Sequence, residues 1–216
     1  MQRDLSEISD GKIYRWNDMA RVRCNDCEGC SSCCRDMEDT VKIDPYDAYM
    51  LSKGLGVSFE TLLEEKAELG VEDGMILPHL KTVGACVFLD GAGRCSIHAF
   101  RPGICRLFPL GRIYEEGKVS YILQVGECQK ENRSKVKIGK WIGIPEHTEY
   151  EAFVLAWYRL RKEAQAVIAA QQEEELIKTL NMFLLHNFYL KSYDTEQLFY
   201  PQFQKRLEQA YRILRA

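Results

Sequence analysis

Nine cysteines stand out in the 216-residue chain, and five of them fall within one short run. Cys24, Cys27, Cys30 and Cys33 follow one another at intervals of three residues, and Cys34 comes directly after. A Cys-x-x-Cys loop turns two sulfurs toward one ion, and soft thiolates select Zn²⁺, Cu⁺ or iron–sulfur centres over Mg²⁺ or Ca²⁺. The run therefore predicts a metal site.

The adjacent pair Cys33–Cys34 bears on how many metal ions are bound. Side chains of neighbouring residues usually diverge, so two such thiolates seldom bind the same tetrahedral ion. The pair suits two neighbouring ions, or one ligand with a bridging or outer sulfur beside it. We therefore expect two metal ions or a multinuclear cluster.

Four further cysteines lie on or beside predicted turns and strand ends, where ligands are usually presented. Together with four cysteines of the run they make eight sulfurs, enough for two four-sulfur sites. Cys24 is left over, either as a spare surface thiol or as a ligand. The predicted ligands are Cys27, Cys30, Cys33, Cys34, Cys86, Cys95, Cys105 and Cys128.

Three polar side chains near Cys105 are candidates for supporting roles. His98 follows Cys95 by three residues and is either a ligand in a Cys₃His site or a structural histidine. Arg101 and Arg106 flank Cys105 and carry guanidinium donors that suit thiolate or sulfide. The alternative is a surface turn whose arginines are solvated.

In combination these motifs resemble the CxxCxxCC cysteine-cluster family over about residues 24–128. The resemblance implies a zinc- or iron-chelating protein (YkgJ-like); a few members are called iron–sulfur oxidoreductases, and the larger flagellin lysine methylases are related. Residues 146–216 fall outside the motif. The matching segments are Cys27-x-x-Cys30-x-x-Cys33-Cys34, Cys86-Val-Phe-Leu, Cys95-Ser-Ile-His98 and Arg101-Pro102-x-x-Cys105-Arg106-x-Phe108-Pro109.

The spacing leaves the choice between zinc and an iron–sulfur cluster open. Bacterial ferredoxins use Cys-x-x-Cys-x-x-Cys-x-x-x-Cys-Pro. Here Cys33 comes one residue early and no proline follows, which argues against a ferredoxin fold. Three functions remain: a metal-binding module, an iron–sulfur oxidoreductase or electron carrier, and a cluster-dependent methyl (group) transferase acting on a protein.

The bulk composition indicates a globular protein in a reducing compartment. Hydrophobic residues make up 46% and charged residues 28% of the chain, and the formal charge of −3 predicts no attraction to nucleic acid or anionic lipid. We find no secretory signal and no stretch of the ~18 apolar residues that would span a bilayer. A cytoplasmic location follows, where disulfides are rare and nine cysteines need another explanation.

Short elements are expected to carry the cysteines. Asp44–Pro45 is a typical helix start, and Asp90–Gly93 is a typical turn. We predict strands at 40–43 and 86–89, helices from Asp44 to about Ser52 and from Ser58 to about Leu69, and a hairpin joining 113–114 to 119–123.

The last part of the chain contains no cysteine and shows three apolar stripes at helical spacing. We therefore predict an α+β fold: a small metal-organised domain at residues 1–145, with short strands and ligand-bearing loops, and a C-terminal helical subdomain at 146–216. These helices either pack on each other and on the metal domain, or offer a groove to a protein partner.

Overall fold

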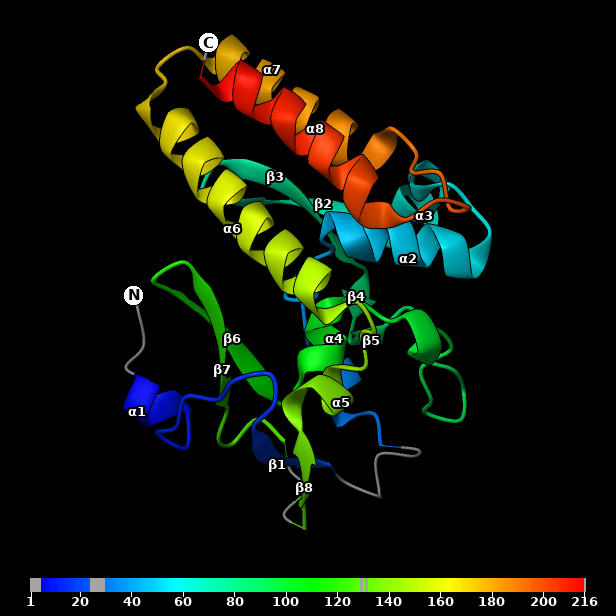
Figure 1. Cartoon of the computed structure of the whole chain (residues 1–216). Coiled ribbons are helices and arrows are strands. Elements are labelled where there is room, and N and C mark those ends of the chain that lie inside the picture. The colour runs from blue at the N-terminus through cyan, green and yellow to red at the C-terminus, as the bar shows by residue number, and fades with distance from the viewer. Residues whose placement is uncertain (1–4, 24–29, 129, 131, 216) are drawn as a thin grey trace.

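A computed structural model describes residues 5–23, 30–128, 130 and 132–215. It confirms the α+β class, because helices are combined with four antiparallel pairs of short strands (Figure 1). The α-helices are α1 (Leu5–Ile8), α2 (Pro45–Leu55), α3 (Phe59–Glu65), α4 (Gly103–Leu107), α5 (Ile138–Ile142), α6 (His147–Ala170), α7 (Glu174–Leu185) and α8 (Phe199–Leu214). Two short 3₁₀ helices, η2 (Ser32–Cys34) and η3 (His98–Phe100), and one π-helical turn, η4 (His186–Leu190), complete the helical elements of the described residues. The strands pair as β1 (Met19–Arg23) with β8 (Ser134–Lys137), β2 (Ala67–Glu72) with β3 (Met75–Leu80), β4 (Thr82–Val83) with β5 (Ala85–Cys86), and β6 (Leu110–Glu115) with β7 (Lys118–Leu123).

Helix α2 begins where the sequence predicts. The Asp44 carboxylate accepts a hydrogen bond from the Asp47 N–H at 2.8 Å, and the Asp47 carboxylate accepts one from the Asp44 N–H. This reciprocal cap satisfies two amide groups that the first helical turn leaves unpaired. Pro45 occupies the first helical position, and Gly56 ends the helix in the left-handed conformation that glycine adopts easily.

The two longer hairpins share one turn chemistry. Asp73 and Gly74 join β2 to β3 with φ angles of 48° and 80°, and Glu116 and Gly117 join β6 to β7 with 50° and 72°. Two successive residues with positive φ match the right-handed twist of the flanking strands, and glycine lowers the cost of the second position. The β6–β7 hairpin confirms the prediction made for residues 113–123.

The long helices form one layer over the β2–β3 hairpin. In Figure 1, α6, α7 and α8 lie together in the upper half, and β3 contacts both α6 and α7. The lower half contains the β6–β7 hairpin, α4, α5 and the β1–β8 pair. One buried apolar cluster draws residues from both halves, including Val22, Leu107, Tyr150 and Phe203. The division into domains at 1–145 and 146–216 stays a prediction.

Three sequence predictions in the middle of the chain need correction. The second helix ends at Glu65 instead of Leu69, because residues from Ala67 onward form β2 and find their hydrogen bonds in β3. The strand predicted at 40–43 is reduced to a single bridge between Lys42 and His79. Of the residues predicted to form a strand at 86–89, only Cys86 lies in β5.

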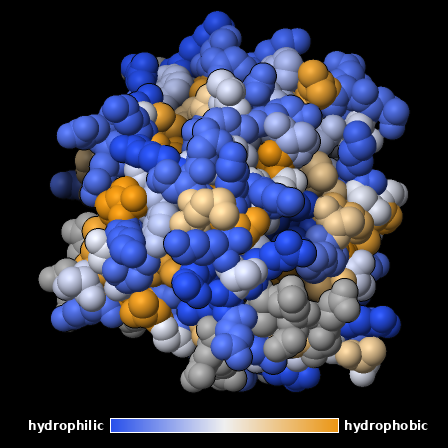
Figure 2. Space-filling view, turned by 60° about the horizontal axis from the view of Figure 1, so that its bottom comes forward, coloured by the Kyte–Doolittle hydropathy of each residue, from blue (hydrophilic) through white to orange (hydrophobic). Residues whose placement is uncertain are grey.

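The surface of the lower end is largely hydrophilic. Figure 2 brings this end forward and shows single hydrophobic residues scattered among polar ones over the described part of the face. Within the described residues, every helix is too short or too polar to cross a bilayer.

Candidate metal centre

Cys33 and Cys34 lie on the η2 turn, which is held against the hairpin that carries Cys86. Directly after the turn, Arg35 forms an antiparallel bridge with Ala85, the neighbour of Cys86 in β5. Backbone hydrogen bonds of this kind fix the position of a loop that has no core of its own. The first cysteine run is therefore brought beside a cysteine more than fifty residues away in the sequence.

Cys86 and Cys95 lie at the two ends of one short loop. The Leu89 N–H donates to the Cys86 carbonyl at 2.9 Å, and Leu89 forms a bridge with Cys95. Between them the Asp90 carboxylate accepts hydrogen bonds of 2.9 and 2.8 Å from the N–H groups two and four residues later. This closed turn confirms the predicted return of the chain at 90–93 and places both thiols in one neighbourhood.

Cys105 lies on α4, and the start of that helix is fixed by Asp47. The Gly103 N–H donates to the Asp47 Oδ1 atom at 2.7 Å. Asp47 is buried, with 3% of its surface exposed, and its other oxygen caps α2 at Asp44. Sequence analysis missed this second partner. Its only sequence signal is the Asp-Pro-x-Asp pattern at the start of α2, and that pattern does not reveal a distant partner.

Five sulfurs lie close enough for their charges to act on one another's ionisation. They come from three separate segments: the η2 turn, β5 with the loop that follows it, and α4. Soft donors gathered in this way fit zinc or an iron–sulfur centre. The five are Cys33, Cys34, Cys86, Cys95 and Cys105.

The pKa values of the neighbouring thiols Cys33 and Cys34 shift in opposite directions. A hydrogen bond from the Cys34 thiol, partly offset by burial, lowers the pKa of Cys33 to about 6. The same hydrogen bond, together with burial, raises the pKa of Cys34 above its usual range. The lowered pKa favours the thiolate form of Cys33, which is the form that binds metal.

The deeper thiols resist ionisation while no cation is beside them. Burial raises the pKa of Cys105, and the negative charges of Asp47 and three other thiolates raise it further. Burial also raises the pKa of Cys86. A metal cation beside these sulfurs would offset the repulsion between the thiolates, so the chemistry of these donors, though not their spacing in the described residues, suits a metal.

Arg101 supplies positive charge to the same group. Burial lowers its own pKa, whereas the charges of Cys105, Cys95 and Cys33 act in the opposite direction. The guanidinium therefore lies within electrostatic reach of three of the gathered sulfurs. This placement suits the role suggested for Arg101 from the sequence, which stays a prediction.

Arg106 and His98 organise the loop between Cys95 and Cys105. The Arg106 side chain donates to the carbonyl groups of Arg101 at 3.0 Å and Ala99 at 2.5 Å. The Arg101 guanidinium contacts His98 Nε2 and donates to the His98 carbonyl at 3.3 Å. The contacts of Arg106 are therefore with the backbone, and those of His98 are with an arginine.

Three predicted ligands remain: Cys27, Cys30 and Cys128. Cys27 lies outside the described residues, as does Cys24, the cysteine left over from the predicted set. The Cys30 sulfur is 3.7 Å from the Ser32 hydroxyl, and Cys128 is half-buried beyond the end of β7. Within the described ranges, no set of three or more Cys, His, Asp or Glu side chains is positioned to hold a metal ion. The eight-cysteine ligand set therefore stays a prediction.

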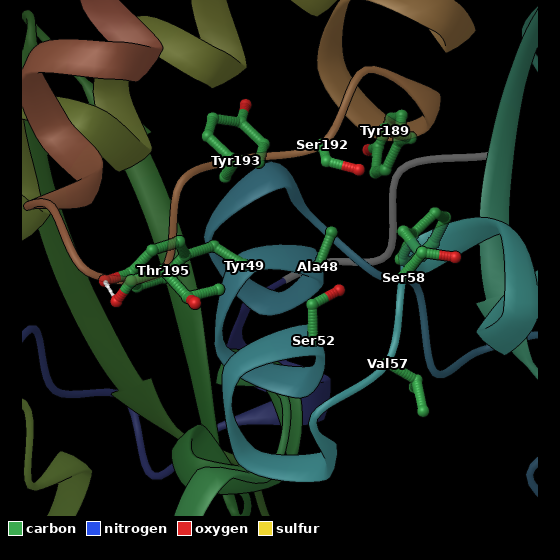
Figure 3. Close-up of a pocket in the computed structure, with 10 residues that line it drawn as sticks. Ala48, Tyr49, Ser52, Val57, Ser58, Tyr189, Ser192, Tyr193 and Thr195 are labelled. Carbon is green, nitrogen blue, oxygen red and sulfur yellow. Dashed lines mark hydrogen bonds between the residues drawn. The ribbon is translucent and has the colours of Figure 1, made fainter.

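A small hollow elsewhere in the fold contains no cysteine. It has a volume of about 70 Å³ and lies between α2, the start of α3 and the segment after η4 (Figure 3). Hydroxyl-bearing side chains line much of it, including Ser52, Ser58 and Thr195. Its size suits a few water molecules rather than a substrate.

Comparison with known proteins gives one match. Residues 26–136 match a family model described as "CxxCxxCC: Putative zinc- or iron-chelating domain". The matched segment includes all five gathered cysteines and more than half of the chain. No curated protein and no solved structure matches the chain.

Proposed function

The chain belongs to the CxxCxxCC family, and on that premise we propose that it binds zinc or an iron–sulfur cluster through thiolates of its cysteine constellation. Cys33, Cys34, Cys86, Cys95 and Cys105 form the inner part of the proposed site. Cys27, Cys30 and Cys128 complete the proposed set of eight, which suits two metal ions or one multinuclear cluster.

The observation that carries this proposal is the convergence of five sulfurs from three segments. None of the three segments is long: η2 has three residues, β5 two and α4 five. Cys86, Cys95 and Cys105 pack against the buried apolar cluster, whereas the η2 turn with Cys33 and Cys34 has no buried residue of its own. Bonds to a shared metal would link the segments.

Arg101 has a defined role in the proposed site. Each thiolate ligand brings one negative charge, and zinc or iron returns only part of it. A guanidinium within reach of Cys33, Cys95 and Cys105 offsets the remainder. Asp47 holds the start of α4 and so fixes the direction from which Cys105 would approach the metal.

Metal and acid-labile sulfide measured on anaerobically purified protein provide the test. Zinc without sulfide would indicate closed thiolate sites, and iron with sulfide would indicate a cluster. Cys33→Ser, Cys86→Ser and Cys105→Ser should each lower the metal content. Cys24→Ser is the matched control, because this cysteine is the one left over from the proposed set. Unchanged metal content in all three variants would contradict the proposal.

A further inference from the structure

A cleft of about 410 Å³ lies away from the cysteines, between the segment at residues 15–17, the start of β7 and the first turns of α6. This volume lies within the range of small-molecule sites in proteins. No cysteine lines the cleft, so the metal centre does not explain it. The side chains that matter for its chemistry are Arg15, Trp16, Lys118, His147, Glu151 and Leu155.

The back wall of the cleft is preorganised. The Trp16 and His147 rings are stacked, with centroids 4.3 Å apart and an interplanar angle of 22°. His147 Nε2 lies 3.2 Å from Glu151 Oε2, and the Tyr121 hydroxyl donates to Glu151 Oε1 at 3.2 Å. Trp16 also packs so closely on the backbone of Gly139 in α5 that a Cβ atom there would not fit. Among the described residues, the Glu151 carboxylate accepts one hydrogen bond, from Tyr121, while His147 Nε2 lies close to it without forming a hydrogen bond.

The rim of the cleft carries two cationic side chains, Arg15 and Lys118. Arg15 and Lys118 are exposed, and among the described residues neither forms an ion pair. The Arg15 guanidinium donates to the Val119 carbonyl at 3.4 Å, and the Arg15 backbone N–H donates to the Asp18 Oδ2 atom at 2.7 Å. A third cation is near, because an Arg159 nitrogen lies 2.9 Å from the place that a Cβ on Gly117 would take. An anion entering the cleft would meet a guanidinium and an ammonium that form no ion pair among the described residues, although the Glu151 carboxylate lines the same cleft and Asp18 lies beside Arg15.

The inner surface is apolar beside this charge. Val119 is buried, Leu155 is half-buried, and the Trp16 ring forms a flat wall. A bare inorganic anion would leave that surface unused, whereas a neutral apolar molecule would leave the guanidinium and the ammonium without a partner. The combination favours a ligand with an anionic end and an apolar body.

We propose that this cleft binds a small organic carboxylate. Its carboxylate is bound by the Arg15 guanidinium, whose planar donors match two carboxylate oxygens, and by the Lys118 ammonium. Its apolar body lies against Trp16 and Leu155. The stacked His147 ring supports the Trp16 wall. The site does not depend on the identity of the bound metal.

Phenylacetate is a suitable probe, used with the metal-loaded full chain. The indole N–H resonances of the three tryptophans separate the cleft from the core, because only Trp16 lines the cleft. Phenylacetate should shift the Trp16 resonance and leave Trp141 and Trp157 in place. Phenylacetamide, which has the same body without charge, and inorganic phosphate, which has charge without the body, should each bind at least about tenfold more weakly, a loss of about 1.4 kcal/mol.

Charge-removing variants sharpen the test. Arg15→Gln and Lys118→Gln should each weaken phenylacetate binding about tenfold, which is within the range for hydrogen bonds to charged groups. Lys178→Gln, an exposed change on α7, is the matched control and should leave binding unchanged. Unmoved Trp141 and Trp157 resonances in each variant would verify the fold. A Trp16 resonance that does not respond to phenylacetate, or responds equally to the amide or to phosphate, would overturn the proposal.

Discussion

In the helical half, Phe153 faces Phe203 with ring centroids 4.8 Å apart and faces Phe199 at 5.1 Å, both edge to face. All three rings are at least 97% buried. In the cysteine-bearing segment, by contrast, the η2 turn contributes no buried residue at all. Aromatic rings packed in this way stabilise a fold without any cofactor. The η2 turn lacks that support, and the loop after Cys86 has it only through Phe88 and Ile97. We therefore expect metal bonds to supply the rest.

Removing the metal should have the largest effect on the difference between the two regions. Structural zinc sites contribute about 10 kcal/mol of apparent folding free energy, and here that contribution should fall on residues 30–36 and 85–106. After chelation these amides should lose protection from hydrogen exchange, while α6 and α8 keep theirs. Equal loss of protection in both halves would show that the metal supports the whole core. Unchanged protection of the loop amides would show that the metal does not stabilise these loops.

Phe203→Ala tests the other half. Removing a buried ring from this cluster should lower the free energy of unfolding by about 3–5 kcal/mol, because transfer and cavity costs add. Denaturant titration would measure the loss. Ile213→Ala, an exposed change on the same helix, should alter stability by less than about 0.5 kcal/mol. The metal content of folded Phe203→Ala protein should equal that of the unmutated chain, and a lower content would mean that the two regions are not independent.

Asn181 tests the connection between α7 and the β2–β3 hairpin. Its side chain accepts from the Ile76 N–H at 2.8 Å and donates to the Gly74 carbonyl at 3.0 Å. Asn181→Leu would leave both backbone groups without a partner, at a cost of about 2 kcal/mol. The control is Met182→Leu, which changes an exposed neighbour. Equal stability of the two variants would show that water replaces the lost bonds.

The helical half was the more predictable of the two. The stripes containing Phe153, Leu184 and Phe203 report burial directly, because one apolar face at helical spacing has to meet another apolar surface. All three residues are buried in the structure. Local signals also sufficed for the cap at Asp44 and the turn at 90–93, since each depends on a few neighbouring residues.

The errors fall where distant partners decide the structure. Residues 67–72 have a pattern that a short helix could continue, and only their pairing with β3 makes them a strand. No strand was predicted at residues 19–23, where β1 pairs with a strand more than a hundred residues later. For the candidate site, the cysteines could be named from the sequence. Which of them converge, and that Asp47 fixes α4, depends on tertiary contacts that spacing does not encode.

Gly103→Ala tests the contact between the two regions and should have a small effect on stability, because Gly103 lies where the regions meet. A Cβ at this position would come within 2.9 Å of the Tyr150 hydroxyl of α6, and that ring is 1% exposed and held by Arg112 through a 2.9 Å hydrogen bond. Since Tyr150 cannot move freely, Gly103→Ala should displace α4 and with it Cys105. The expected loss of stability is about 1 kcal/mol.

The informative measurement on Gly103→Ala is the rate at which a chelator removes the metal. A displaced Cys105 should make that release faster than in the unmutated chain. Gly91→Ala is the matched control: it lies on the loop between Cys86 and Cys95, and its added Cβ would meet open space. If both variants release metal at the same rate, the contact between α4 and α6 does not position Cys105. Faster release from Gly103→Ala alone would mean that the aromatic core, though it holds no thiol, sets the geometry of the metal centre.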